Sequence, residues 1–204
     1  MNRPPNAQRR SEKSHQATLA AAMDLCVEQG YGKVTVEAIA ARAGVSKKTI
    51  YRWWPTKGAV VLEALIALVG KATQFPDTGD VAADMRTQMT AVLDNVMTGP
   101  HAAVYAGVIA EAQHDETLAH NLLAHLLQPR IEAARDRLRL AREKGQLAPD
   151  ADVELAVDLL YGPVYYRLLL NLGMYSREQL HTLIDLVIGA FAPVPATPPA
   201  PDPG

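Results

Sequence analysis

Apolar residues recur at intervals of three and four positions along most of the chain, and no long stretch alternates strictly between apolar and polar residues. An amphipathic helix has this spacing, whereas a half-buried strand repeats every two residues. The clearest stripe joins Leu19, Ala22, Met23, Cys26 and Val27. The pattern therefore predicts an all-α fold of about nine helices.

Capping residues, glycines and prolines predict where these helices begin and end. We expect the first helix to start near Ser11 or Ser14 and to stop at Gly30. Two short helices follow, over 36–43 and 47–54. Their expected N-caps are Thr35 and Ser46, and the proline at 55 stops the second. The later helices are expected at about 56–69, 81–97, 101–113, 116–144, 153–172 and 177–191.

Two prolines fall inside these later helices. Pro129 removes a backbone donor from the helix over 116–144, so we expect a kink or an interruption there. Gly162 and Pro163 lie midway along the helix over 153–172. Two interpretations of that pair stay open, a mechanical joint within the body and a static kink.

Composition narrows the class of protein. The chain has 204 residues, of which 49% are hydrophobic, and this is enough for one domain or two small ones with a real core. The single cysteine, Cys26, excludes an intrachain disulfide framework and a multi-cysteine zinc site, and its place on the apolar stripe predicts a core residue. No apolar run reaches about 18 residues, and the basic N-terminus is unlike a signal peptide. We expect a cytoplasmic protein with no membrane partner.

Charge is distributed unevenly along the chain. Residues 1–57 carry ten Lys and Arg against four Asp and Glu, a net charge of +6, whereas the remainder has a net charge of −8. A basic head on an acidic body indicates that only the head contacts a polyanion. Charge alone is equally consistent with a solvated basic surface.

The two short helices around Gly44 have the sequence form of a helix-turn-helix. The first is small and rich in alanine, so it can pack close to the second, and glycine permits the backbone conformation of the turn. Ile50 and Trp54 are four residues apart and should face the core. The outer side of the second helix carries Lys47, Lys48, Thr49, Tyr51 and Arg52. Such a helix fits the major groove of B-form DNA, where Thr and Arg reach base edges.

Residues 34–57, VTVEAIAARAGVSKKTIYRWWPTK, resemble the DNA-binding segment of the TetR/AcrR family of transcriptional repressors. The matching positions are Thr35, Ile39, Ala40, Ala43, Gly44, Val45, Ser46, Thr49, Ile50, Tyr51, Trp54 and Lys57. Position 53, commonly His or Tyr in that family, is Trp here. The chain length and the plan of nine helices are also similar to the family.

The resemblance implies a set of DNA contacts. The expected DNA-binding residues are Thr35, Ser46, Lys47, Lys48, Thr49, Tyr51, Arg52, Trp53 and Lys57. Thr35, Tyr51 and Lys57 would hold phosphates with support from Lys47, while Lys48 and Thr49 would face the groove. Arg52 would either contact a phosphate or make no contact with DNA. Trp53 would donate its indole N–H to a phosphate, wedge against a sugar, or support the first helix. Arg9, Arg10 and Lys13 would add contacts from an N-terminal arm.

The last two helices have more apolar surface than one stripe requires, and a helix that is apolar all round must be covered on every side. The resemblance implies that they form a four-helix bundle with a second copy of the chain. Such a dimer places its two helix-turn-helix domains, the reading heads, on a palindromic operator. The alternative is burial within one chain. The expected dimer contacts are Leu168, Leu169, Leu180, Ile184, Val187 and Ile188.

The family also implies a small-molecule pocket among the helices of the body, and adaptable apolar side chains with polar tips are available to line it. The expected lining residues are Met85, Met89, Tyr105, Tyr161 and Tyr165, with Met97 and Tyr166 as further candidates. For each residue, ordinary core or dimer packing is the alternative. Such a pocket suits a mostly apolar or aromatic effector.

Two groups of charged residues are interpreted as ordinary surface features and not as binding sites. Glu111, His114 and Asp115, with His120 and His125 downstream, have spacings that a metal site uses, but surface carboxylates beside histidine are common, and we expect no metal. The helix over 116–144 interleaves basic and acidic residues, which predicts a solvated, ion-paired face. Its charged residues are Arg130, Glu132, Arg135, Asp136, Arg137, Arg139, Arg142, Glu143 and Lys144.

The sequence thus predicts a flexible basic arm over 1–10, a helix-turn-helix domain over 11–57, a ligand-binding and dimerisation domain over 58–192, and a disordered proline-rich tail over 193–204. The predicted function is that of a dimeric repressor released from its operator by a small molecule. The alternative is a DNA-binding activator or architectural protein without an effector. No arrangement of nucleophile, base or phosphate-binding glycines supports an enzyme, and no cofactor is expected.

Overall fold

The computed structural model describes residues 5–69 and 75–194, with side chains from residue 9 onward. These residues form helices and connecting segments with no strand among them, as the sequence predicts. The α-helices are α1 (Pro5–Gln29), α2 (Val36–Ala43), α3 (Lys47–Tyr51), α4 (Lys57–Val69), α5 (Val81–Val92), α6 (Gly99–Ala112), α7 (Glu116–Leu122), α8 (Gln128–Glu143), α9 (Val153–Leu169) and α10 (Arg177–Ala190).

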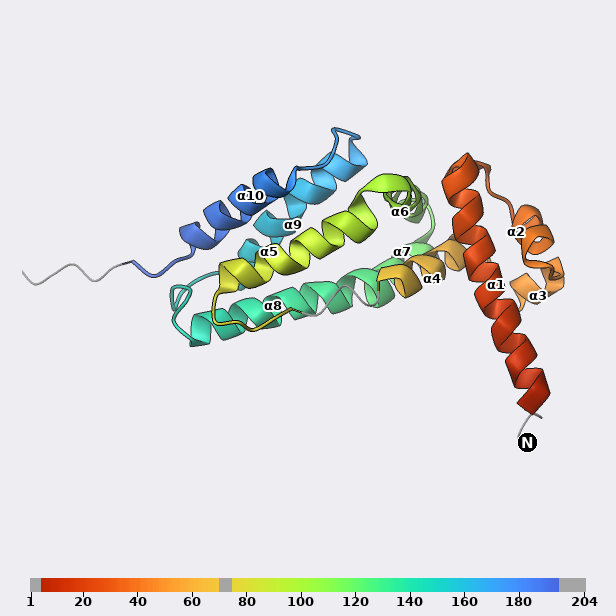
Figure 1. Cartoon of the computed structure of the whole chain (residues 1–204), viewed down its shortest axis with the longest axis horizontal. Helices are drawn as coiled ribbons and strands as arrows, with labels where there is room; N and C mark the ends of the chain where they lie inside the picture. The colour runs from red at the N-terminus through yellow and green to blue at the C-terminus, as the bar shows by residue number, and fades with distance from the viewer. Residues whose placement is uncertain (1–4, 70–74, 195–204) are drawn as a thin grey trace, which may run out of the picture.

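The helices are arranged in two parts (Figure 1). Helices α1–α3 form one end of the molecule, and α1 packs on both α2 and α4. Helices α5, α8, α9 and α10 run side by side away from that end, with α10 packed on α5 and α9. Helices α4, α6 and α7 lie between the two parts, so any signal from the body reaches α1–α3 through them.

The N-terminal helix is longer than the sequence analysis predicts. Helix α1 begins at Pro5, so residues 5–10 are helical and the expected flexible arm is wrong there. Proline is favoured at the first helical position, because its φ is already helical and its missing N–H has no partner there. The residues that follow it, including Gln8, Arg9 and Arg10, are good helix formers. Residues 1–4, and 195–204 of the expected tail, lie outside the described residues.

The turn between α2 and α3 has the expected chemistry. Thr35 Oγ1 accepts a hydrogen bond from the Ala38 amide (3.2 Å), and Ser46 Oγ accepts one from the Thr49 amide (3.1 Å), so both predicted N-caps are confirmed. Gly44 ends α2 with a φ of 65°, in the left-handed region that favours glycine. Between α1 and α2 a short 3₁₀ turn, Tyr31–Lys33, was not predicted.

Helix α3 is shorter than expected, because its α-helical residues end at Tyr51 instead of 54. The amides of Trp53 and Trp54 still bond to the Ile50 carbonyl (both 2.9 Å), so the last turn only tightens before Pro55. The residue before a proline disfavours the α conformation, which explains this early end.

Two helices contain a π-helical turn, a feature often found at functional sites. Residues Leu93–Met97 extend α5, and Leu123–Leu127 join α7 to α8 just before Pro129. The helix expected over 116–144 therefore has no break in the chain of helical residues, but a π turn replaces its α-helical hydrogen bonding just before Pro129, where an interruption was predicted. With α7 and α8 counted as one, the described chain has the nine helices that the sequence predicts.

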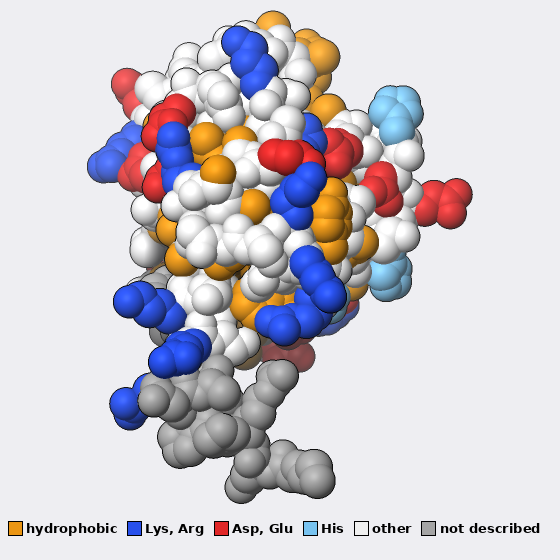
Figure 2. Space-filling view, turned by 90° about the vertical axis from the view of Figure 1, so that its right-hand side faces the viewer, with side chains coloured by type: hydrophobic (Ala, Val, Ile, Leu, Met, Phe, Trp, Pro, Cys, Tyr) orange, Lys and Arg blue, Asp and Glu red, His pale blue; other side chains and the backbone are white. Residues whose placement is uncertain are grey.

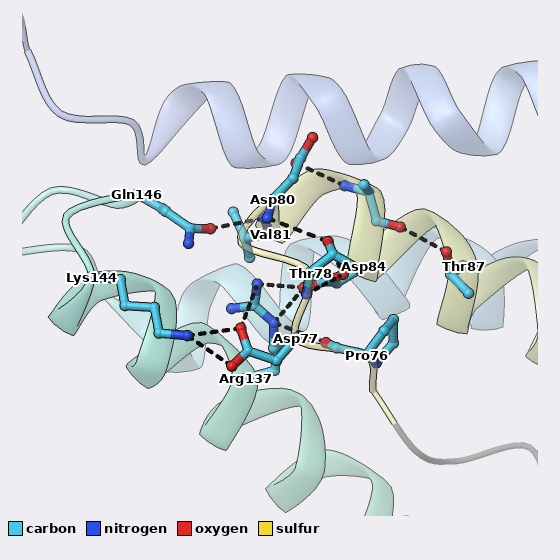
Figure 3. A network of polar contacts seen from close by, with 11 residues as sticks. Pro76, Asp77, Thr78, Asp80, Val81, Asp84, Thr87, Arg137, Lys144 and Gln146 are labelled. Atoms are coloured by element: carbon cyan, nitrogen blue, oxygen red, sulfur yellow. Dashed lines mark hydrogen bonds and ion pairs between the residues drawn. The ribbon is translucent and has the colours of Figure 1, made fainter.

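One polar network fixes the start of α5 against α8 (Figure 3). The Arg137 guanidinium, buried in the body, donates two hydrogen bonds to the Asp84 carboxylate (2.5 and 2.8 Å) and one to the Pro76 carbonyl. Thr78 donates to the same carboxylate from its hydroxyl (2.7 Å). Burial raises the pKa of Asp84, but the bonds from Thr78 and Arg137 outweigh it and hold the pKa below its usual range. Arg137 therefore does not belong to a solvated face, and that expectation is wrong for this residue.

Candidate nucleic-acid interface and internal cavity

The outer side of α3 is exposed and lined by the side chains that the sequence singles out. A shallow depression follows this helix, and its walls are Ser46, Lys48, Thr49, Tyr51 and Arg52. The Tyr51 ring is 53% exposed, and no hydrogen bond involves its hydroxyl among the described residues. Figure 2 looks onto this end of the molecule, where Lys and Arg side chains lie on both halves and acidic side chains lie mainly on the upper half, so the lower half is mostly basic.

Several of the expected contact residues already have partners in the protein. Lys47 Nζ lies 3.0 Å from a carboxylate oxygen of Glu37 on α2, in an exposed ion pair. Ser46 Oγ and Thr49 Oγ1 are 2.9 Å apart and share a hydrogen bond. Exposed ion pairs contribute little, so Lys47 can exchange Glu37 for a phosphate at low cost. The hydroxyls of Ser46 and Thr49 chiefly stabilise the helix start.

Trp53 packs toward α1 and is half-buried. Its ring lies 5.3 Å from the His15 imidazole and 5.3 Å from the Trp54 ring, both in edge-on arrangements. The Arg52 guanidinium lies over its outer face, 5.0 Å from the ring centre. Of the roles left open for Trp53, this geometry fits support of α1.

The neighbouring Trp54 is buried, as predicted, and is held by α4. Its indole N–H donates to a carboxylate oxygen of Glu63 (2.5 Å), and the other oxygen of Glu63 lies 2.8 Å from His15 Nε2. One carboxylate thus joins the end of α3 to both α1 and α4. The orientation of α3 is consequently set by the helices behind it.

Lys57, expected to hold a phosphate, points to the body instead. Its ammonium donates to the Tyr31 carbonyl (3.2 Å), lies 3.8 Å from Glu111 on α6 and sits 4.6 Å from the centre of the Tyr31 ring. Lys57 must leave or share these partners to reach DNA.

A cavity of about 370 Å³ lies within the body, a size that suits a small organic ligand. Its wall is mostly apolar and comes from α5, α8, α9 and both π turns. The lining residues are Gln88, Val92, Met97, Leu127, Arg130, Ile131, Val157, Asp158, Tyr161, Gly162 and Tyr165.

The polar groups of this wall are few. Tyr161 donates to the Gln88 side-chain oxygen (2.8 Å), and the hydroxyls of Tyr105 and Tyr165 are hydrogen-bonded to each other (2.8 Å). Burial raises the pKa of all three tyrosines, so these hydroxyls are neutral at physiological pH. Arg130 adds a positive charge, and burial lowers its pKa from the usual value.

Comparison with known proteins identifies the family. A family model described as bacterial regulatory proteins of the tetR family matches residues 19–64, and one described as the tetracyclin repressor-like C-terminal domain matches residues 75–187. The chain belongs to the TetR family. Regulators of this family bind DNA and act as dimers, and they are transcriptional regulators, not enzymes.

Individual relatives agree over nearly the whole chain. This TetR-family chain is 38% identical over 188 residues to the HTH-type transcriptional regulator YdeS of Bacillus subtilis, covering 92% of this chain and 93% of the relative. It is 30% identical to the DNA-binding transcriptional repressor TetR of Mycobacteroides abscessus, covering 88% and 94%. The crystal structure of the TetR-family regulator SCO0332 superposes with a TM-score of 0.72 at 37% identity, covering 89% of this chain and all of the other.

The cavity of this TetR-family chain only partly matches the predicted lining. Tyr161 and Tyr165 line it, as does Met97. Met85 is fully buried in the core, and Met89 borders a small adjoining void of about 10 Å³ that shares Val92, Met97 and Tyr161 with the cavity. Tyr105 lies behind Tyr165 and reaches the cavity only through their hydrogen bond. The placements of Met85, Met89 and Tyr105 on the wall are therefore wrong, since these side chains face neighbouring helices.

Sequence reasoning missed several lining residues, above all Arg130. The alternation of charges on α8 predicted a solvated face, and that prediction is wrong for Arg130. The one available signal was its position directly after Pro129, where the helix is interrupted.

The predicted dimer contacts also need correction. Leu180 and Ile184 are 1% and 0% exposed, and Leu168, Val187 and Ile188 are buried as well, because α10 packs on α5 and α9 of the same chain. Those five residues belong to the core, and only Leu169 of the predicted set is exposed. A different apolar stripe faces outward from α9, comprising Leu155, Leu159, Tyr166 and Leu169, with Leu186 on α10.

The remaining candidates have structural roles in the described part of the chain. No group of three His, Cys, Asp or Glu residues there is placed to hold a metal, and Asp115 instead caps α7 through the Leu118 amide (3.0 Å). Cys26 is buried in the core as predicted, and burial raises its pKa to about 11. Within residues 5–69 and 75–194, no helix is long and apolar enough to cross a membrane.

Proposed function

We propose that this TetR-family regulator is a ligand-responsive repressor that binds a palindromic operator as a homodimer and is released by a small, largely apolar effector. The observation that carries the proposal is the occurrence, in one chain, of an exposed helix-turn-helix face and a largely apolar cavity in the body. The repressor named among its relatives supports the sign of regulation.

The DNA-reading part of the proposal rests on the exposed side of α3. Lys48, Tyr51 and Arg52 are exposed and have no carboxylate partner among the described residues. Cations and hydroxyls on such a helix bind phosphates, and Lys48 and Thr49 would face the groove. Thr35 and Lys47 flank the helix and would add phosphate contacts. Trp53 is proposed to support α1 and not to contact a phosphate.

The dimer part rests on the outward stripe of α9. Leu155, Leu159, Tyr166 and Leu169 are spaced by multiples of a helical turn and lie on one face, with exposed Gly162 between them. An apolar stripe of this length on an otherwise charged surface is a typical interface between protein chains. Leu186 of α10 extends the same surface.

The effector part rests on the path between the cavity and α4. Met97 and Leu127, on the two π turns, line the cavity, and those turns lead directly into α6 and α8. Helix α6 packs on both α1 and α4. A ligand that favours one arrangement of these helices would change the spacing of the two reading heads, and operator affinity would fall by its differential binding energy.

Selection of bound duplexes from a random pool tests the DNA-reading part. The full chain should enrich a palindrome, and Tyr51→Ala should lose it without a change in melting temperature, because Tyr51 is exposed. Salt-sensitive binding without sequence preference would contradict the proposal.

Oligomeric state tests the dimer part. Leu159→Glu should sediment as a monomer and bind the operator weakly, whereas Leu123→Glu, at an exposed leucine in the π turn between α7 and α8, should remain dimeric. If both variants remain dimeric, the α9 stripe is not the interface. If no small molecule in a broad screen changes operator affinity, the chain is a DNA-binding activator or architectural protein instead.

A further inference from the structure

The cavity wall holds one guanidinium that lacks a counter-charge. Three other arginines of α8 have acidic partners: Arg135 pairs with Glu132 and Glu154, Arg137 with Asp84, and Arg139 with Asp136 and Glu154. Arg142 instead donates to the Ala151 carbonyl and does not line the cavity. For Arg130, the described residues provide a single acceptor, the Leu126 carbonyl, and no carboxylate within 4.0 Å. Arginine stays charged in proteins, and a partly buried charge without a partner is costly. An anion beside Arg130 would offset that cost.

A hydroxyl donor is available next to this charge. In the hydrogen bond between Tyr105 and Tyr165, one hydroxyl donates and the other accepts, so the hydrogen of the acceptor is unused. Tyr165 lines the cavity and Tyr105 does not, which places the free hydrogen on the cavity side when Tyr105 is the donor. The positive charge of Arg130 acts on both tyrosines, since it opposes the rise in their pKa values.

We propose that the cavity binds an amphiphilic monocarboxylate whose head group is held by Arg130 and the Tyr165 hydroxyl and whose apolar body lies against Val92, Met97, Ile131 and Val157. A carboxylate accepts two parallel hydrogen bonds from one guanidinium, and charge-assisted bonds of this kind are about twice as strong as neutral ones. This inference rests on the proposed function, because it gives the chemical class of the effector.

A cationic or neutral ligand fits the wall less well. Asp158 is the other charged residue of the wall, but it is exposed, so a cation there would remain in water. A neutral ligand would leave the partly buried guanidinium of Arg130 without a counter-charge. The charge on the head group is therefore the property to vary.

The test uses the full chain without DNA and three probes that share one apolar body: decanoate, decanamide and decylamine, below micelle-forming concentrations. Calorimetric titration should show decanoate binding about tenfold more tightly than decanamide. Naphthoate and naphthamide repeat the comparison with a rigid body. If neither carboxylate binds, or if the amide or the amine binds as tightly, the proposal is overturned.

Variants then locate the head group. Arg130→Gln should remove the preference for the carboxylate, and Arg130→Lys should keep part of it. Arg139→Gln, a charge-matched control on the same helix, should leave it unchanged. A preference that survives Arg130→Gln in a folded protein overturns the assignment. The comparison of probes on the unmodified chain stands even if Arg130→Gln fails to fold.

A separate measurement of operator release distinguishes this inference from the proposed function. If decanoate binds through Arg130 but leaves the operator complex intact, the cavity assignment holds and the sensor function fails. If decanamide releases the operator as well as decanoate does, the sensor function holds and the anionic head group is wrong.

Discussion

The ammonium of Lys57, in the first turn of α4, lies 3.8 Å from a carboxylate oxygen of Glu111, in the last turn of α6. It also donates to the carbonyl of Tyr31, in the 3₁₀ turn between α1 and α2. One side chain thus connects the DNA-binding end to the body. The family resemblance assigns Lys57 to a phosphate, and on that assignment Glu111 and DNA would compete for the same charge.

The first prediction follows from that competition. Glu111→Gln should raise operator affinity about two- to fivefold, because a half-exposed ion pair contributes up to about 1 kcal/mol and its loss frees Lys57 for a phosphate. The salt dependence should steepen by about one phosphate contact. Fluorescence anisotropy at several salt concentrations measures both. Glu143→Gln, at an exposed carboxylate on α8, is the charge-matched control, and equal effects of the two variants would exclude the competition.

The same junction depends on close packing at a glycine. A Cβ added to Gly107 of α6 would meet three atoms of the Tyr31 side chain at 2.8 Å, so α6 and the turn that carries Tyr31 would have to move apart. Gly107→Ala should therefore destabilise the chain by about 1–3 kcal/mol in urea unfolding, despite the better helix propensity of alanine.

Gly189→Ala is the matched control for this effect. Gly189 is also helical, but a Cβ there meets nothing within 4 Å. Alanine should stabilise at that position by up to about 1 kcal/mol. Stabilisation by both substitutions would show that Tyr31 does not seat against α6.

Local chemistry made much of the reading head predictable from the sequence. Thr35 and Ser46 cap the starts of α2 and α3 with their side-chain oxygens, and Gly44 ends α2 in the left-handed conformation. Each of these roles follows from the residue type itself. The core positions of Ile50 and Trp54 follow from their helical spacing. These features depend on neighbours a few residues away, which the sequence specifies directly.

The cavity and the outward face of the body were not predictable in this way. Leu180 and Leu159 are both apolar residues on apolar helices. The packing of α10 on α5 and α9 buries Leu180, whereas Leu159 faces outward from α9, and only the tertiary structure distinguishes the two. Likewise Arg137 pairs with Asp84, 53 residues away, whereas Arg130 on the same helix has no such partner. Tertiary contacts distinguish residues that the periodicity of the sequence treats alike.

The position of Trp53 leads to a further prediction. If the ring supports α1 through His15 and Trp54, Trp53→Phe should keep operator affinity within about twofold, because phenylalanine preserves the aromatic contact. If the indole N–H donates to a phosphate, the same variant should lose about tenfold or more in affinity, the usual value of a hydrogen bond to a charged group. Anisotropy with the selected operator separates the two. Trp53→Ala should lower both stability and affinity in either case, so it serves only as the positive control.

The final prediction concerns the buried pair of Asp84 and Arg137. Asp84→Asn should lower the free energy of unfolding at pH 7 by about 3 kcal/mol, because it leaves the buried Arg137 charge without its main partner. Since folding lowers the pKa of Asp84, its contribution is fully present above the ordinary carboxyl pKa of about 4 and is lost as the pH falls through the folded value. Urea unfolding between pH 7 and pH 3 should therefore show a free energy of unfolding that falls less steeply with acid for Asp84→Asn than for the unmodified chain.

The control is Asp185→Asn, which removes the exposed partner of Arg86, a residue that lies on α5 as Asp84 does. It should lower the free energy of unfolding by less than about 1 kcal/mol. Equal losses for the two variants would mean that the Asp84 pair stabilises the fold no more than a surface ion pair does.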